Sequence, residues 1–217
     1  MPRPVIFGAA AFALLLAVVA WRISDSSASE IPFEPNTKPP QAAPLCPWRE
    51  PAGDLKRFFP SATRYEPETR ILSGQRLELA ARLGRRPTGD ENALHIYRSF
   101  EEQSPLGAVL IRRVKGAYGA IELVLAVGTN GHVRGLRLQR LREPEPIAAA
   151  LQNPDWLRSF EGQRSDSSCK LGRDIPDVVP EARASAEAIV DGVRSLLILL
   201  AVSNESHAQN PVAARHH

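Results

Sequence analysis

The pattern of hydrophobic and polar positions divides the chain into four parts. Residues 4–21 form an uncharged apolar run about long enough to cross a bilayer core, which predicts a transmembrane anchor over residues 1–22. Residues 23–47 are rich in serine and proline and are typical of an extended linker. Apolar residues then recur with strand and helix periods over residues 48–203, which predicts one folded domain, and residues 204–217 form a polar tail.

Within the predicted domain, most of the strand signal lies in the middle. Alternating or continuous apolar residues predict four strands, at 93–100, 107–114, 120–127 and 133–141. An irregular strand over 61–71 is expected before them. Asn130-Gly131 tolerates positive φ at both central positions of a tight turn, so it predicts a hairpin between the last two strands.

Helical patterns flank these strands, at 54–60, 75–83, 147–151, 154–160 and 185–202. Ser73 is expected to cap the second helix and Gly84 to end it, with Leu77, Leu79, Ala80 and Leu83 inward. Ser185 is expected to be the N-cap of the last helix. The order predicts an α+β domain, an antiparallel sheet flanked by helices.

Composition narrows the possible functions only a little. The chain has 217 residues, 43% of them hydrophobic, which suits one domain and an anchor. Its net charge is +3, without a Lys/Arg run, and its aromatic content is 6%, so no nucleic-acid partner is expected.

The end of the apolar run is typical of a retained anchor, because Trp21 and Arg22 lie where an interfacial ring and a cation are favoured. A cleaved signal peptide is the alternative, with Val18 and Ala20 as small residues before the cut. Both interpretations place the rest of the chain outside the cytoplasm.

Cys46 and Cys169 could pair in an oxidising compartment, which would contribute roughly 3–5 kcal/mol in the chain-entropy model. Two free thiols are the alternative. No metal site is expected, because there is no CxxC motif and no histidine close to either cysteine.

Five short motifs follow one another in the predicted domain: Phe58-Phe59-Pro60, Lys115-Gly116-Ala117-Tyr118-Gly119-Ala120-Ile121, Asn130-Gly131-His132-Val133-Arg134-Gly135, Trp156-Leu157-Arg158-Ser159-Phe160-Glu161-Gly162 and Ala188-Ile189-Val190-Asp191-Gly192-Val193. In this order, behind an anchor, they resemble the FMN-binding domain of the small G- or C-type subunits of Rnf and Nqr electron-transfer complexes. The resemblance implies a single-pass protein of the inner (plasma) membrane, a domain in the periplasm, and other membrane or periplasmic subunits of a redox complex as partners.

The family attaches FMN through its phosphate to the threonine of a D-x-x-[S/T]-G-A-T motif. In this chain Asp177 matches the first residue, but Pro180, Glu181 and Arg183 replace the hydroxyl residue, the glycine and the threonine. Arg183 has no hydroxyl to form the phosphoester, and the charge of Glu181 opposes a phosphate. The family's E-T-P-G-L-G loop corresponds only to residues 143–147. Covalent flavin is therefore not expected.

If FMN binds at all, the resemblance places it non-covalently at Asp177, Arg183, Ser185, Gly116 and Gly119. Arg183 could hold the phosphate and Ser185 is the nearest hydroxyl. Arg183 could equally be a surface residue, and the two glycines could serve a strand bend.

No catalytic constellation is recognisable, so no catalytic activity of its own is expected. The favoured hypothesis is a flavin-free structural or docking subunit. An electron-transfer subunit with non-covalent FMN and a secreted binding module are the alternatives.

Overall fold

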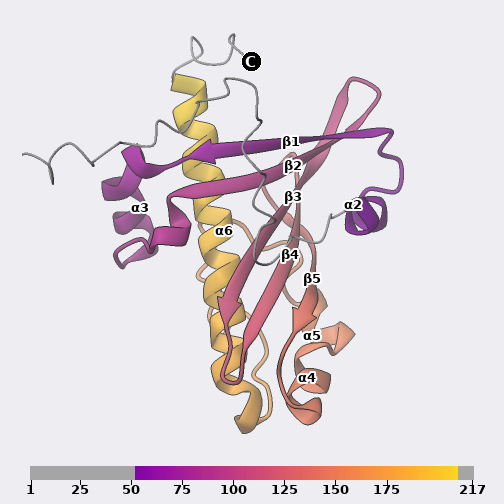
Figure 1. The fold of residues 1–217 in the computed structure, drawn as a ribbon, viewed down its shortest axis with the longest axis vertical. Coiled ribbons are helices and arrows are strands. Elements are labelled where there is room, and N and C mark those ends of the chain that lie inside the picture. Colours follow the sequence, from indigo (N-terminus) through magenta and orange to yellow (C-terminus); the bar gives the residue numbers. More distant parts are fainter. Residues whose placement is uncertain (1–51, 210–217) are drawn as a thin grey trace, which may run out of the picture. The chain divides into compact units, whose positions relative to one another are not determined.

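A five-stranded antiparallel sheet forms the centre of the computed structural model, which describes residues 52–209 (Figure 1). The strands are β1 (Arg64–Ile71), β2 (Ala93–Glu101), β3 (Ser104–Lys115), β4 (Ala120–Gly128) and β5 (Val133–Leu141). They lie in the sheet in sequence order, which confirms the antiparallel arrangement with helices around it. A hairpin joins β4 and β5 as predicted, but only Gly131 has positive φ (78°), whereas Asn130 does not.

Helices surround the sheet, and their positions agree with the predicted ones to within a few residues except at the C-terminal end of the last helix. They are α2 (Ala52–Phe58), α3 (Arg76–Leu83), α4 (Glu145–Leu151), α5 (Pro154–Arg158) and α6 (Arg183–Gln209). Short 3₁₀ turns lie at Ser73–Gln75 (η1), Gly89–Glu91 (η2) and Pro180–Ala182 (η3). None of the helices within residues 52–209 is long and apolar enough to cross a bilayer.

The predicted anchor and linker, Cys46 and the last residues of the tail lie outside the described part of the chain. The anchor, the cleavage alternative and the disulfide with Cys169 therefore stay predictions.

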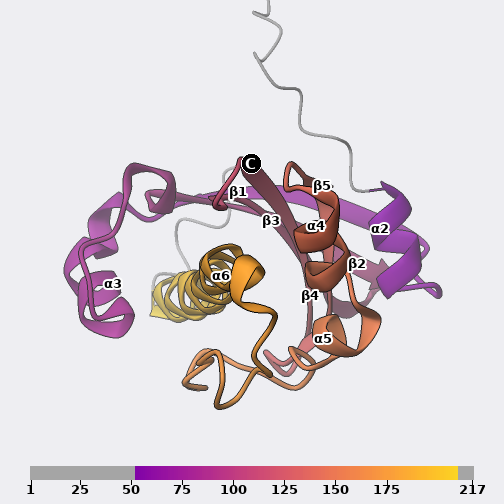
Figure 2. The ribbon, with the colours of Figure 1, turned by 90° about the horizontal axis from the view of Figure 1, so that it is seen from below.

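Strand β4 is buried on both faces, and its alternation separates two hydrophobic clusters. Leu123, Leu125 and Val127 pack in the cluster that contains α6. Val124 and Ala126 pack in a smaller cluster with residues of α2 and with Phe59. Successive side chains of a strand point to opposite faces, so α6 and α2 lie on opposite sides of the sheet (Figure 2).

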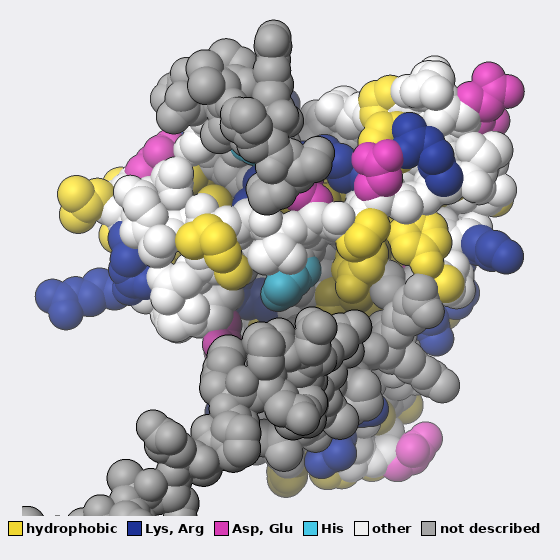
Figure 3. Space-filling model, turned by 45° about the horizontal axis from the view of Figure 1, so that its top comes forward, with side chains coloured by type: hydrophobic (Ala, Val, Ile, Leu, Met, Phe, Trp, Pro, Cys, Tyr) yellow, Lys and Arg dark blue, Asp and Glu magenta, His cyan; other side chains and the backbone are white. Residues whose placement is uncertain are grey.

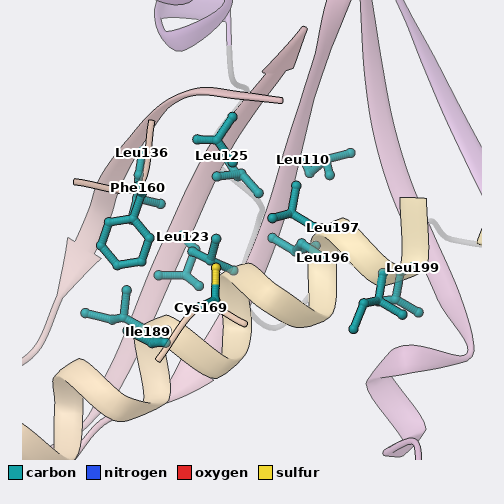
Figure 4. Close-up of a cluster of buried hydrophobic side chains, with 14 of the residues drawn as sticks. Leu110, Leu123, Leu125, Leu136, Phe160, Cys169, Ile189, Leu196, Leu197 and Leu199 are labelled. Atoms are coloured by element: carbon teal, nitrogen blue, oxygen red, sulfur yellow. The ribbon is translucent and has the colours of Figure 1, made fainter. Parts of the chain in front are cut away.

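Helix α6 packs along one face of the sheet, against β2, β3 and β4. Its apolar stripe includes Ile189, Leu196 and Leu197, which point toward leucines of β3 and β4 (Figure 4). A Cβ atom on Gly192 would lie only 2.6 Å from Val114, so this glycine lets the helix approach the sheet closely.

Three local expectations are wrong. Ser73 begins η1 and makes no capping hydrogen bond, although Gly84 ends α3 as predicted, with φ 71° and its N–H bonded to the Ala80 carbonyl. Leu77 is 89% exposed, because it lies two positions from the buried Leu79 and so on another side of the helix. Ser185 is not an N-cap, since η3 leads straight into α6 at Arg183.

Helix α6 also continues past the predicted end at Val202 to Gln209. Arg70 of β1 donates to Ser203 Oγ (2.8 Å) and Asn204 Oδ1 (2.9 Å), and Arg82 of α3 donates to Glu205 Oε1 (3.0 Å). These contacts connect the polar last turns to the sheet and to α3, which an apolar pattern cannot reveal.

Candidate functional site

Three segments far apart in the sequence meet at the start of α6, at the lower end of the view in Figure 1. They are the β3–β4 turn at residues 116–119, Glu143 after β5, and the first turn of α6. The Ser185 hydroxyl accepts a hydrogen bond from the Ala117 N–H (2.8 Å) and donates one to Glu143 Oε1 (2.9 Å). We call Ser185, Glu143 and the turn the Glu143 cluster. The cluster brings together three of the five residues predicted for non-covalent FMN binding: Ser185, Gly116 and Gly119.

The two glycines of the turn are explained by the close approach of the segment after β5. A Cβ atom on Gly116 would lie 2.0 Å from Glu143 Oε1, and one on Gly119 would lie 2.8 Å from the Cβ of Arg142. The Gly116 N–H bonds to the Gly119 carbonyl at 2.8 Å and closes the turn. A larger residue at either position would push the neighbouring segment away, so both glycines have a packing role within the chain.

Glu143 is the residue of this cluster that the sequence reasoning did not single out as a site residue. Its Oε1 accepts from Ser185 and lies 3.4 Å from the Tyr118 N–H. Its Oε2 is buried without a hydrogen-bond partner among the described residues. A carboxylate here repels a phosphate group, since like charges at short range are costly where water is scarce.

Asp177 and Arg183 form a separate, exposed group. Arg183 Nη1 lies 2.6 Å from Asp177 Oδ2, and its Nε lies 3.1 Å from Glu187 Oε1 one turn along α6. The charge of Asp177, together with the hydrogen bonds from Arg183 to Glu187 and Asp177, raises the pKa of Arg183. A phosphate at Arg183 would have to displace the carboxylate of Asp177 or Glu187. Glu181 lies two residues before Arg183 and adds a further negative charge to this segment.

The structure therefore divides the five predicted cofactor residues into two groups. Gly116, Gly119 and Ser185 belong to the Glu143 cluster, whereas Asp177 and Arg183 pair with each other. Both groups satisfy their polar atoms largely within the chain.

Two hollows of the surface lie elsewhere. One of about 710 Å³ lies between the loop at residues 165–171 and α6, and one of about 690 Å³ lies along β5. None of the five predicted cofactor residues lines either of them. The predicted flavin residues thus lie away from both of these hollows.

Cys169 lines the first hollow but is itself almost fully buried. Burial, and to a smaller extent the charge of Asp174, raises the pKa of its thiol to about 11. The thiol is therefore protonated near neutral pH and is a weak nucleophile. Among residues 52–209, no group of three or more histidine, cysteine or acidic residues could hold a metal ion.

A buried ion cluster around Glu91 was missed as well. Glu91 accepts two hydrogen bonds from Arg85 (both 2.9 Å) and others from Arg112 (3.0 Å) and Ser195 (2.5 Å). Thr88 and Glu91 form a capping box, whose T-x-x-E spacing is visible in the sequence. The arginines and the serine come from other elements and could not be assigned from spacing.

Comparison with known proteins gives no assignment for this geometry. No model of a known protein family matches the chain, and no curated protein matches it either. The resemblance to the FMN-binding domain accordingly stays a prediction.

Proposed function

We propose that the domain is a flavin-free docking module of a membrane redox complex. The absence of flavin is supported by the residues that the resemblance assigns to FMN, because Ser185 and Arg183 already bond within the chain. The membership of such a complex, the membrane anchor and the periplasmic location rest on the resemblance and on residues 1–22 alone.

The observation that carries the proposal is the position of the Glu143 carboxylate. Its Oε1 lies against Gly116 and is hydrogen-bonded to Ser185, so a negative charge occupies the point where predicted cofactor residues converge. A flavin phosphate placed there would meet a like charge. It would also need the Ser185 hydroxyl, which already donates to Glu143 and accepts from Ala117.

Arg183 gives no simple alternative site. It is half exposed and paired with Asp177 and Glu187, so phosphate binding would exchange one solvated ion pair for another. Exposed ion pairs contribute only about 0–1 kcal/mol, too little to hold a nucleotide without further contacts.

The test is to purify the full chain from membranes in mild detergent and to record its absorbance, its intact mass and its partners. The expected result is a colourless protein, without flavin mass and without response to added FMN, that co-purifies with other membrane proteins. A yellow preparation, or flavin fluorescence quenched on titration, would refute the proposal in favour of an electron-transfer subunit with bound FMN.

A graft tests the role of Glu143 separately. The triple change Pro180→Ser, Glu181→Gly and Arg183→Thr restores the family's attachment motif. We expect no covalent flavin when this variant is made together with the attaching transferase, because Glu143 remains in place. Flavin mass on the variant would contradict that reasoning.

A further inference from the structure

The groove along β5 has the form of a binding site for a strand. Six consecutive residues of β5, Arg134 to Gln139, line this hollow of about 690 Å³. Side chains of consecutive strand residues point to opposite faces, so a hollow lined by all six is open along the edge of the strand. Arg57 and Phe58 of α2 line it too, as do Leu157 and Arg158 of α5.

The edge of β5 is open over most of its length. β5 is the last strand of the sheet, with β4 as its neighbour. Within residues 52–209, the backbone hydrogen bonds that β5 makes away from β4 are confined to Val133. Its N–H donates to the Gln163 carbonyl (2.8 Å), and its carbonyl accepts from the Gly162 N–H (2.9 Å). An edge strand presents further N–H and C=O groups that can pair with an added strand.

The charge of the groove is predominantly positive. Arg57, Arg134, Arg137 and Arg158 line it against one acidic residue, Glu161. Arg137 pairs with the buried Asp54, and Arg158 forms an exposed pair with Asp155. Of the four arginines that line the groove, Arg57 and Arg134 therefore form no ion pair with the described residues; both are exposed, and the Arg134 guanidinium lies 5.0 Å from the centre of the Phe59 ring.

The opposite edge of the sheet, strand β1, carries residues that protect it against pairing with a further strand. Strand β1 carries Pro67 in its middle, together with two arginines and two glutamates. Proline and mixed charges discourage strand addition. The surface shown in Figure 3 likewise mixes acidic and basic side chains. Strand β5 has three arginines, no proline and no acidic residue, so its charge selects a partner of the opposite sign.

We propose that the β5 groove binds an extended acidic segment of a partner protein as a sixth strand of the sheet. Main-chain hydrogen bonds to β5 supply the affinity, and carboxylates facing Arg57 and Arg134 supply the selectivity. This inference rests on the docking role proposed above and assigns it to one surface.

The probe is a fluorescent synthetic peptide of about eight residues, the length of an ordinary strand, in which glutamate alternates with threonine or valine. A peptide with lysine in place of glutamate is its control. The full chain in mild detergent should bind the acidic peptide and not the basic one. Exchange of the backbone amides of residues 134–141 with deuterium should slow when the acidic peptide is bound.

The variants separate the groove from general charge. Changing both Arg57 and Arg134 to glutamine should weaken binding about tenfold. Arg140→Gln is the matched control, since Arg140 is an exposed arginine of β5 that does not line the groove. It should change the affinity by less than about twofold.

Equal binding of the basic peptide, equal loss in Arg140→Gln, or binding without protection of β5 would each overturn the proposal. So would stronger binding to anionic lipid vesicles than to the peptide. If the wild-type chain and the double variant co-purify with membrane partners equally well, binding at the groove is refuted and the docking role stands. If the chain binds the acidic peptide but purifies without partner proteins, the docking role is refuted and peptide binding at the groove stands.

Discussion

Replacing Glu91 with glutamine removes the charge from a buried cluster that ties three elements together. Glu91 lies in η2 and is fully buried, Arg112 comes from β3 and Ser195 from α6. Breaking a buried ion pair by removing one partner costs about 3–5 kcal/mol. The side chain of Arg85 is 33% exposed and forms a second ion pair, with Asp191. Water and the Asp191 carboxylate can therefore stabilise Arg85 after Glu91 has lost its charge. We therefore expect the lower end, about 3 kcal/mol less free energy of unfolding.

The pH dependence gives the same prediction a second, independent readout. Burial alone would raise the pKa of Glu91, but hydrogen bonds from Arg85 and Ser195 outweigh it and hold the pKa far below its ordinary value. A carboxylate with a lowered pKa in the folded state stabilises the fold above its unfolded pKa of about 4.3, and this contribution is lost as the pH falls. The difference between wild type and Glu91→Gln should be constant near neutral pH and shrink below about pH 5.

Urea unfolding of the purified chain, followed by circular dichroism across this pH range, measures both quantities. Glu78→Gln is the control, because Glu78 forms an exposed pair with Arg82 and should cost less than about 0.5 kcal/mol. A cost of Glu91→Gln below about 1 kcal/mol, or a difference that stays unchanged in acid, would refute the reasoning.

Three further predictions concern packing and use the same unfolding assay. Ser185→Ala removes the hydrogen bonds to Ala117 and Glu143 and should cost about 1 kcal/mol; no loss would mean that water replaces both. Gly116→Ala should cost about 2 kcal/mol, and about 1 kcal/mol when Glu143 is also alanine. The Glu143 carboxylate is the nearest group to the new Cβ (2.0 Å), and Ile121 Cδ1 (2.7 Å) remains in the double variant; equal costs would contradict the contact with Glu143. Leu77→Ser should stay within about 0.5 kcal/mol and Leu79→Ala should cost about 2–5 kcal/mol, whereas similar costs would place both leucines in the core.

The sequence predicts what depends on neighbours along the chain. The nearly continuous apolar run of β4 and the Asn130-Gly131 hairpin signal are local, and the structure has a buried strand and a hairpin at these places. So is the glycine that ends α3, because a left-handed C-cap needs no distant partner. The Leu77 error arises in a helix of only two turns, where a run of apolar residues does not fix which side is buried.

The remaining features depend on contacts across the fold. The environment of Ser185 depends on the β3–β4 turn and on Glu143, which lies 42 residues away in sequence. The last turns of α6 are polar, and their contacts with Arg70 and Arg82 are made only once β1 and α3 lie beside the helix. The hydrophobic periodicity of the sequence does not reveal such contacts between distant segments. The resemblance names candidate residues, but only the assembled structure shows which of them lie together.

The two edges of the sheet are unequal, and this limits how the protein can assemble. Pro67 has no N–H and lies in the middle of β1, so that edge interrupts any ladder that would continue through it. A strand added at β5 consequently finds no second acceptor on the far side of the same sheet. With the strand addition that we propose at β5, we therefore expect one bound segment per domain. Pro67 therefore disfavours the stacking of copies of the domain edge to edge into an open fibre.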